Sequence, residues 1–179
     1  MSTPEPAPDE IAALLQVEHL LDQRWPETKI EPSTARIAAL LELLGSPQKG
    51  YPSIHIAGTN GKTSVARMVD ALLTALHRRT GRTTSPHLQS AVERISIDGR
   101  PISPATYVDT YREIEPFVEL VDRQSEAGGG PRCSKFEVVT AMAFAAFADA
   151  PIATAGTMET PGWWGSGARR TLRPYLGAP

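Results

Sequence analysis

The chain has 179 residues, of which 41% are hydrophobic, and its formal net charge is −2. This length allows one domain with a substantial core, and the near-neutral charge argues against a general nucleic-acid-binding protein. Apolar runs fall short of the ~20 residues of a membrane span, and the Pro-rich, acidic N-terminus lacks the apolar segment of a signal peptide. The lone cysteine, Cys133, excludes an internal disulfide and is read as a packing residue. We therefore expect a monomer in the cytoplasm, with no nucleic-acid or membrane partner.

The first part of the chain predicts a disordered tail and two helices. Residues 1–8 are read as the tail. Asp9 is suited to cap a helix that Pro26 ends, and Ser33 or Thr34 is suited to cap a second helix that stops at Gly45. Apolar residues recur at helical spacing in both: Ile11, Leu14, Leu15 and Leu21 in the first, and Ile37, Leu40, Leu41 and Leu44 in the second.

A glycine-bearing turn then joins a short β-type run, 53–57, to a third helix. It reads Gly58-Thr59-Asn60-Gly61-Lys62-Thr63-Ser64. Glycines let backbone N–H groups point inward, and the start of a helix adds unpaired N–H groups and the positive end of its dipole. Lys62 is suited to reach outer phosphates, and Thr63 or Ser64 to hold Mg²⁺. The turn predicts a nucleotide-binding site; the alternative is a plain strand-to-helix turn with a solvated Lys62.

The third helix carries one apolar stripe and a basic end. Its apolar residues are Val65, Met68, Val69, Leu72, Leu73 and Leu76. His77, Arg78 and Arg79 follow at the end where cations suit the helix dipole, which explains them more simply than contact with nucleic acid. Downstream, residues 92–97 alternate as a strand that turns at Asp98-Gly99.

Two more helices are predicted in the second half of the chain. Ser103-Pro104 is a helix start, and Pro116 is expected to kink or split that helix. Ser134 and Glu137 have the spacing of a capping box. The helix that follows is apolar nearly all round, which is typical of a helix buried between layers.

The order of these elements predicts the fold class. Strand, loop and helix in succession, with no hairpin pairs, favour an α/β fold in which a P-loop-type parallel sheet is flanked by helices. Residues 151–153 are suited to begin another strand, but no helical or strand period follows. We expect an ATP-binding domain over 9–153 and an atypical tail over 154–179, either disordered or the product of a frameshift.

Several ordered motifs resemble the folylpolyglutamate synthase/dihydrofolate synthase family, which is related to the Mur ligases. They are Gly58-Thr59-Asn60-Gly61-Lys62, Thr84-Ser85-Pro86-His87-Leu88, Glu93-Arg94-Ile95 with Pro101-Ile102-Ser103, and Phe136-Glu137. The resemblance runs from about residue 10 to about residue 152 and implies an incomplete Mur-ligase-like central domain. The family's later motifs and its C-terminal glutamate-binding domain have no counterpart here, which suggests a frameshift, a gene-model error or a natural truncation.

The resemblance implies an ATP-dependent carboxylate–amine ligase that adds glutamate to a folate or dihydropteroate through an acyl phosphate. Residues 58–64 would bind ATP, with Lys62 in a catalytic role. Oxygen ligands for Mg²⁺ would come from Ser64 or Thr63, together with Ser85 and Glu137. The family usually has Gly where Thr63 stands, which favours Ser64. Ser85 and His87 would shape the pterin pocket.

Simpler interpretations remain open at this point. Glu137 fits its capping box, Ser85 fits loop chemistry, and His87 fits a surface imidazole. Two alternatives to the folate ligase also remain: another Mur-type ligase, against which the Thr84–Leu88 and Phe136-Glu137 motifs argue, and a non-catalytic nucleotide-binding fragment. We expect the chain alone to be a poor ligase.

Overall fold

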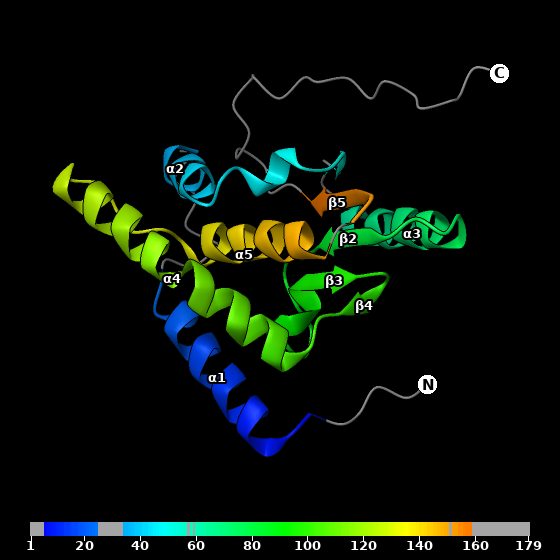
Figure 1. The fold of residues 1–179 in the computed structure, drawn as a ribbon, viewed down its shortest axis with the longest axis horizontal. Helices are drawn as coiled ribbons and strands as arrows, with labels where there is room; N and C mark the ends of the chain where they lie inside the picture. The colour runs from blue at the N-terminus through cyan, green and yellow to red at the C-terminus, as the bar shows by residue number, and fades with distance from the viewer. Residues whose placement is uncertain (1–5, 25–33, 57, 59, 151, 159–179) are drawn as a thin grey trace.

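The computed structural model describes residues 6–24, 34–56, 58, 60–150 and 152–158. Within them, five strands form one mixed sheet in the order β1-β5-β2-β3-β4 (Figure 1). β5 lies between β1 and β2 and runs parallel to both, whereas β3 and β4 continue the sheet as antiparallel neighbours. The strands are β1 Ser53–Ile56, β2 Thr80–Thr83, β3 Ile95–Ile97, β4 Arg100–Pro101 and β5 Thr154–Met158.

Helices cover the sheet, as predicted for an α/β fold. Figure 1 shows α1, α2 and α4 gathered around α5, with α3 at the other end of the molecule. The helices are α1 Pro8–Asp22, α2 Ala35–Leu43, α3 Lys62–Ala75, α4 Pro104–Ala127 and α5 Lys135–Asp149, with short 3-10 helices η1 Pro47–Lys49 and η2 Ala91–Arg94. Among the described residues, none of these helices is long and apolar enough to cross a membrane.

Strand β2 shows that α3 and α5 lie on opposite faces of the sheet. Its successive side chains point to opposite faces. A Cβ at Gly81 would meet the ring of Phe147 of α5 at 2.6 Å. The neighbouring Arg82 instead donates from Nε to Asp70 Oδ2 of α3 at 3.0 Å. Glycine at position 81 therefore allows α5 to approach one face closely, while α3 packs on the other.

The core lies around α5, which confirms the burial predicted from its apolar sequence. Met142 and Phe147 of α5 are fully buried, as are Leu21 of α1 and Leu40 of α2. Tyr51 is anchored against α5, because its hydroxyl donates to the carbonyl of Phe144 at 3.1 Å and its ring meets Phe147 edge-on. The helical layer on this face is thus packed as one body with the sheet.

Three helices begin at a predicted residue, since Thr34, Ser103 and Ser134 are the N-caps of α2, α4 and α5. In α4 and α5 the side chain of the N-cap residue also accepts a hydrogen bond. Ser103 Oγ accepts from the Thr106 N–H at 3.0 Å, and Ser134 Oγ accepts from the Glu137 N–H at 3.2 Å. The predicted cap at Asp9 is wrong, because Ala7 is the N-cap and Pro8 opens α1. Pro116 was predicted to kink or split its helix; it does not split it, since α4 continues through this residue, and the kink stays a prediction.

The strands differ from the sequence-based prediction at the antiparallel end. Strand β2 was not predicted, and β3 begins at Ile95 rather than at residue 92, because η2 occupies the residues before it. The absence of hairpin pairs was likewise wrong, since β3 and β4 pair across the Asp98-Gly99 turn. This Thr-Gly-Arg-Thr strand lacks apolar alternation because Thr80 and Arg82 bond Asp70 on one face, while Gly81 leaves room for the Phe147 ring on the other.

The last described strand lies later than predicted. β5 occupies Thr154–Met158, so these residues belong to the sheet and not to an atypical tail. A central parallel strand is covered on both faces and needs no alternation of polar and apolar residues, which is why its small residues gave no strand signal. The predicted tails at 1–5 and 159–179 lie outside the described residues.

Candidate active site

The turn between β1 and α3 has the backbone of an anion-binding loop. Gly58 and Gly61 have φ of +149° and +76°, a region that L side chains avoid. Gly61 is the N-cap of α3 and Lys62 is its first residue. The Lys62 ammonium donates to the carbonyl of Gly58 across the turn. Ala57 and Thr59 lie outside the described residues, so the role expected for Thr59 stays a prediction.

The first turn of α3 offers donors for an anion. Val65 is the residue whose N–H bonds back to Gly61, at 2.9 Å. The N–H groups of the three residues before it therefore have no partner within the helix and point along its axis. Thr63 and Ser64 are exposed, and Lys62 is half-buried beside them. This combination is suited to phosphate binding.

Parallel pairing brings a second loop to the same edge of the sheet. Because β1, β5 and β2 run parallel, their carboxyl ends share one edge, where ligands of open α/β sheets bind. The phosphate loop follows β1, and the segment 84–90 follows β2. Thr84 fixes the base of that segment, since its N–H donates to the Arg94 carbonyl at 3.0 Å.

Glu93 holds the tip of this second loop. Its carboxylate accepts the N–H groups of Leu88, Gln89 and Ser90 at 3.0 to 3.2 Å. These backbone hydrogen bonds lower the pKa of Glu93, and the one from Leu88 has the largest effect. The ionised side chain therefore holds the shape of the loop, a role that sequence reasoning missed. The available signal is the spacing of Ser90 and Glu93, which form a capping box at the start of η2.

His87 is engaged by a neighbouring cation. Arg94 Nε donates to His87 Nδ1 at 2.9 Å. Burial of the ring, followed by the positive charge of Arg94, lowers the pKa of His87. The imidazole is therefore neutral at physiological pH, with its proton on Nε2. Ser85 is half-buried in the same loop, and its bond to Pro86 is cis.

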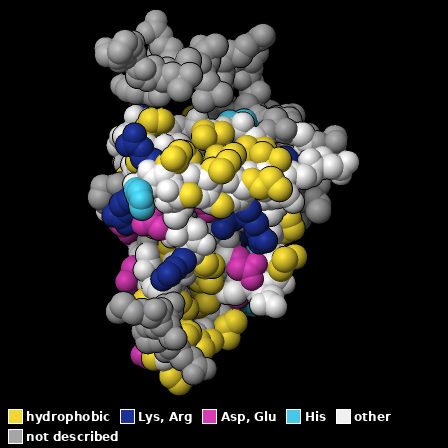
Figure 2. Space-filling model, turned by 90° about the vertical axis from the view of Figure 1, so that its right-hand side faces the viewer, with side chains coloured by type: hydrophobic (Ala, Val, Ile, Leu, Met, Phe, Trp, Pro, Cys, Tyr) yellow, Lys and Arg dark blue, Asp and Glu magenta, His cyan; other side chains and the backbone are white. Residues whose placement is uncertain are grey.

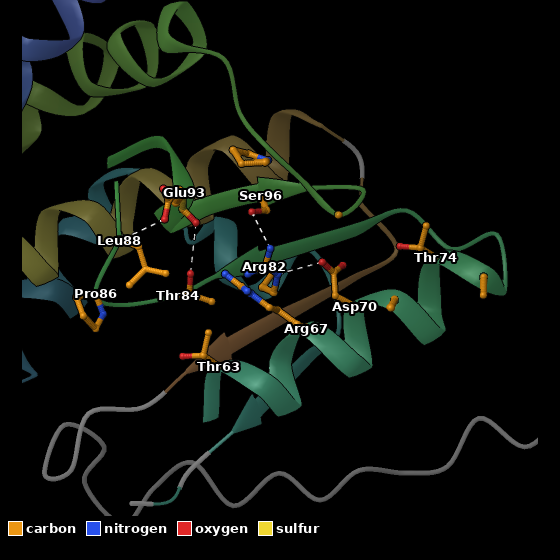
Figure 3. A pocket seen from close by; sticks show the side chains of 14 residues that line it. Thr63, Arg67, Asp70, Thr74, Arg82, Thr84, Pro86, Leu88, Glu93 and Ser96 are labelled. Atoms are coloured by element: carbon orange, nitrogen blue, oxygen red, sulfur yellow. Dashed lines mark hydrogen bonds and ion pairs between the residues drawn. The ribbon is translucent and has the colours of Figure 1, made fainter. Parts of the chain in front are cut away.

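A cleft of about 830 Å³ joins the two loops along the side of α3. Figure 3 shows Thr63, Pro86 and Leu88 at one end of it and Thr74 at the other, with Arg67 of α3 between them. The lining includes neither Ser85 nor His87, so their predicted contact with substrate stays a prediction. Thr63 is the residue through which the phosphate loop and the cleft meet.

The wall of the cleft is a buried polar network that sequence reasoning missed. Arg82 of β2 pairs with Asp70 of α3 at 3.0 Å and donates to Ser96 Oγ of β3 at 3.0 Å. Thr80 also donates its hydroxyl to Asp70. A buried charge is tolerated when it is paired and hydrogen-bonded. The one sequence feature that could have indicated this network is Asp70. Helical spacing places this carboxylate on the same face of α3 as Ala66, the face that meets the sheet.

Glu137 closes its capping box with one carboxylate oxygen, and its other oxygen makes no hydrogen bond. The carboxylate is 1% exposed. Its Oε2 accepts the Ser134 N–H at 2.7 Å and the Arg36 Nε–H at 3.3 Å. Its Oε1 is buried with no hydrogen-bond partner. The cap is thus confirmed, while the metal role stays a prediction; the described residues hold no group of three or more His, Cys, Asp or Glu side chains arranged for a metal.

Cys133 is excluded from the chemistry. It is fully buried, and burial raises the pKa of its thiol to about 12. A thiol with so little thiolate is a poor nucleophile. This agrees with its interpretation from sequence as a packing residue.

Comparison with known proteins decides the family. No family model matches the chain. The dihydrofolate synthase/folylpolyglutamate synthase of Mycobacterium tuberculosis is 81% identical over 150 residues, which cover 82% of this chain and 31% of that protein. The chain is a partial, N-terminal portion of a member of the folylpolyglutamate synthase family. The dihydrofolate synthase/folylpolyglutamate synthase of Bacillus subtilis is 36% identical over 67% of this chain and 27% of its own length.

Solved structures of folylpolyglutamate synthases share the fold. The M. tuberculosis folylpolyglutamate synthase complexed with ADP has a TM-score of 0.79 and 77% identity over 84% of this chain and 32% of its own. The Thermotoga maritima folylpolyglutamate synthase has a TM-score of 0.74 and 39% identity over 83% of this chain and 33% of its own. The resemblance and the α/β fold predicted from the sequence are confirmed, and the chain spans about a third of the length of these relatives.

Proposed function

We propose that this chain is the nucleotide-binding portion of an ATP-dependent ligase that joins glutamate to a folate through an acyl phosphate. The names of its relatives support the reaction, and the ADP complex of the M. tuberculosis relative supports the nucleotide. A further relative, 29% identical, was solved as a complex with AMPPCP and folate. The observation that carries the proposal is the cleft that joins Thr63, beside the phosphate loop, to the Thr84–Leu88 segment.

In this proposal, the loop and the first turn of α3 bind the phosphates. Transfer of a phosphoryl group depends mainly on positioning and on neutralising charge. The free N–H groups at the start of α3 supply fixed donors, and Lys62 supplies a cation that already reaches across the loop to Gly58. When ATP binds, its phosphate oxygens would replace that carbonyl as the acceptor for Lys62, because they are stronger acceptors for an ammonium group.

The donor set fits Mg²⁺. This ion prefers oxygen ligands and keeps several waters, so few protein ligands are needed. The hydroxyl of Ser64 or Thr63, the hydroxyl of Ser85 and the buried Oε1 of Glu137 are of the right kind, and Glu137 Oε1 has no hydrogen-bond partner. When bound, Mg²⁺ would neutralise charge on the phosphates.

The cleft suits a substrate with both flat apolar parts and carboxylates. Pro86, Leu88 and Pro101 provide apolar lining, and Arg67 provides an exposed guanidinium. Arg82 is already paired with Asp70, so Arg67 is the better candidate for a substrate carboxylate. A folate placed along the cleft would bring its carboxylate toward Thr63 and the phosphates of ATP.

Amide formation requires more than these residues. Holding an amine against an acyl phosphate is worth roughly 7–11 kcal/mol of barrier. The chain covers 31% of the M. tuberculosis relative, and the remainder of a family-length enzyme would supply the glutamate site. We therefore expect this chain to bind ATP and to turn over poorly by itself.

A chimaera tests the proposal. The matched portion of the M. tuberculosis relative is replaced by residues 6–158 of this chain, and glutamate incorporation is assayed with a reduced folate, ATP and Mg²⁺. We expect turnover by the chimaera, background incorporation by residues 1–179 alone, and loss of turnover when Lys62→Ala is introduced. A folded chimaera that binds ATP but incorporates no glutamate would instead favour a non-catalytic nucleotide-binding protein.

A further inference from the structure

Arg67 brings an unpaired positive charge to the cleft. Figure 2, which faces the end of the molecule where α3 lies, shows Lys and Arg side chains at that end with Asp and Glu side chains between them. The contacts of each cation therefore decide whether it is available. Arg82 in the wall of the cleft pairs with Asp70 at 3.0 Å. Arg67 is exposed and makes no hydrogen bond or ion pair with any residue that the structure describes.

The acidic side chains that line the cleft are already engaged by other groups. They are Asp70 and Glu93. Asp70 accepts from the Thr80 hydroxyl through Oδ1 and from Arg82 Nε through Oδ2. Glu93 accepts three backbone N–H groups of the second loop at 3.0 to 3.2 Å. The lining thus leaves Arg67 without a counter-ion, and a guanidinium can bind a carboxylate through two parallel hydrogen bonds.

Arg67 lies one turn of α3 beyond Thr63. Four residues of helix rise about 6 Å along the axis, and residues at this spacing share a face. Both residues line the cleft. Figure 3 shows Arg67 between the two ends of the cleft, with its side chain directed toward Thr84. A guanidinium therefore lies about one helical turn from the phosphate loop, within the same cleft.

The two carboxylates of a glutamyl group match this spacing. Four carbon–carbon bonds of about 1.5 Å join their carboxyl carbons, which are therefore about 5 Å apart when the group is extended. In the proposed reaction of a folate, the γ-carboxylate accepts the phosphoryl group beside Thr63. The α-carboxylate of the same glutamyl group then reaches the level of Arg67. Pteroate, whose single carboxylate is bonded to an aromatic ring, has no second carboxylate to place there.

We propose that Arg67 distinguishes acceptors that end in a glutamyl group from acceptors that lack one. Its guanidinium binds the α-carboxylate, which does not react, while the reacting carboxylate lies beside Thr63. This assignment rests on the proposed function, because it needs the folate to lie in the cleft. Folate and pteroate differ by this one glutamyl group, so comparing them isolates the contact.

Calorimetric titration of the full chain with folate and with pteroate tests the assignment, with the ATP analogue AMPPCP and Mg²⁺ present throughout. We expect Arg67→Gln to weaken the binding of folate about tenfold, because hydrogen bonds between charged groups are lost. The affinity for pteroate should stay unchanged. Arg67→Lys keeps the charge but not the planar set of donors, so its affinity for folate should lie between those of the parent and Arg67→Gln.

Arg112→Gln is the matched control, because Arg112 is an exposed arginine of α4, a helix that contributes no residue to the lining of the cleft. It should leave both affinities unchanged, and all variants should keep the parent's melting temperature and its affinity for AMPPCP. Unchanged binding of folate by Arg67→Gln, an equal loss for pteroate, or a loss of AMPPCP binding would each overturn the assignment while leaving the proposed function in place. If the parent chain binds neither acceptor, the proposed placement of folate in the cleft is wrong, and the role of Arg67 is wrong with it.

Discussion

Arg94 donates a hydrogen bond from Nε to Nδ1 of His87 at 2.9 Å, which links the Glu93-Arg94-Ile95 motif to the Thr84–Leu88 loop. Arg94 is buried and His87 is half-buried. An arginine cannot give up its proton, so the imidazole must accept with a neutral Nδ1. Protonation of His87 would replace this hydrogen bond with repulsion between two cations.

This contact predicts a pH dependence of stability. The pKa of His87 in the folded protein lies below its ordinary value of 6.5. The unfolded chain therefore binds the proton first, and the contribution of His87 is complete above about pH 6.5 and is lost as pH falls through the folded pKa. Urea unfolding followed from about pH 8 to pH 5 should show this loss.

His87→Gln separates that contribution from other titrations. Glutamine keeps an acceptor for Arg94 but does not titrate. The variant should therefore lose less stability than the parent between about pH 6.5 and pH 5. Identical pH profiles for the two proteins would show that the imidazole is not held neutral by this contact.

Gly81→Ala should destabilise the protein by about 1–3 kcal/mol, the usual cost of overpacking. A Cβ at this position would meet three ring atoms of Phe147 at 2.6 to 2.8 Å. Thermal or urea unfolding measures the change. Phe147→Leu should cost stability alone yet relieve part of the Gly81→Ala effect, so the two changes should be non-additive. Strict additivity would mean that α5 does not press on β2 in this way.

Glu137→Gln should weaken the Mg²⁺-dependent part of ATP binding. Glutamine retains the capping-box geometry but removes the carboxylate charge that a metal ligand needs. Arg36→Gln is the matched control, because it breaks the same ion pair, at 3.3 Å, from the other side. It should lower stability while leaving the Mg²⁺ dependence intact. If both variants change stability alike and neither changes the response to Mg²⁺, Glu137 acts as a cap and ion-pair partner only.

Local chemistry explains which features could be predicted from the sequence. The glycine turn before α3 and the Ser134–Glu137 cap are encoded within a few adjacent residues, so the structure confirms both. Strand β2 was missed because its partners lie outside the strand: Asp70 belongs to the preceding helix α3, and Phe147 belongs to α5. β5 was predicted too early in the chain because a central strand of small residues shows no alternation.

Helix α3 shows a different limit. Helical periodicity predicts the helix, and α3 is present at Lys62–Ala75. Periodicity cannot say what covers an apolar face, and in this chain Met68 and Leu72 remain exposed. The face that meets the sheet is instead built on Ala66 and the polar Asp70. The exposure of Met68 and Leu72 follows from the tertiary arrangement, which residue spacing does not encode.

Calorimetric titration of residues 1–179 with ATP, with and without Mg²⁺, tests the central claim that residues 58–64 form a working phosphate site. We predict saturable binding that Mg²⁺ strengthens and that Lys62→Ala largely abolishes. Lys62 lies at the loop–helix junction with its side chain only half-buried, so the variant should keep the parent's free energy of unfolding to within about 0.5 kcal/mol. Equal ATP affinity in the parent and in a folded Lys62→Ala variant would contradict the account.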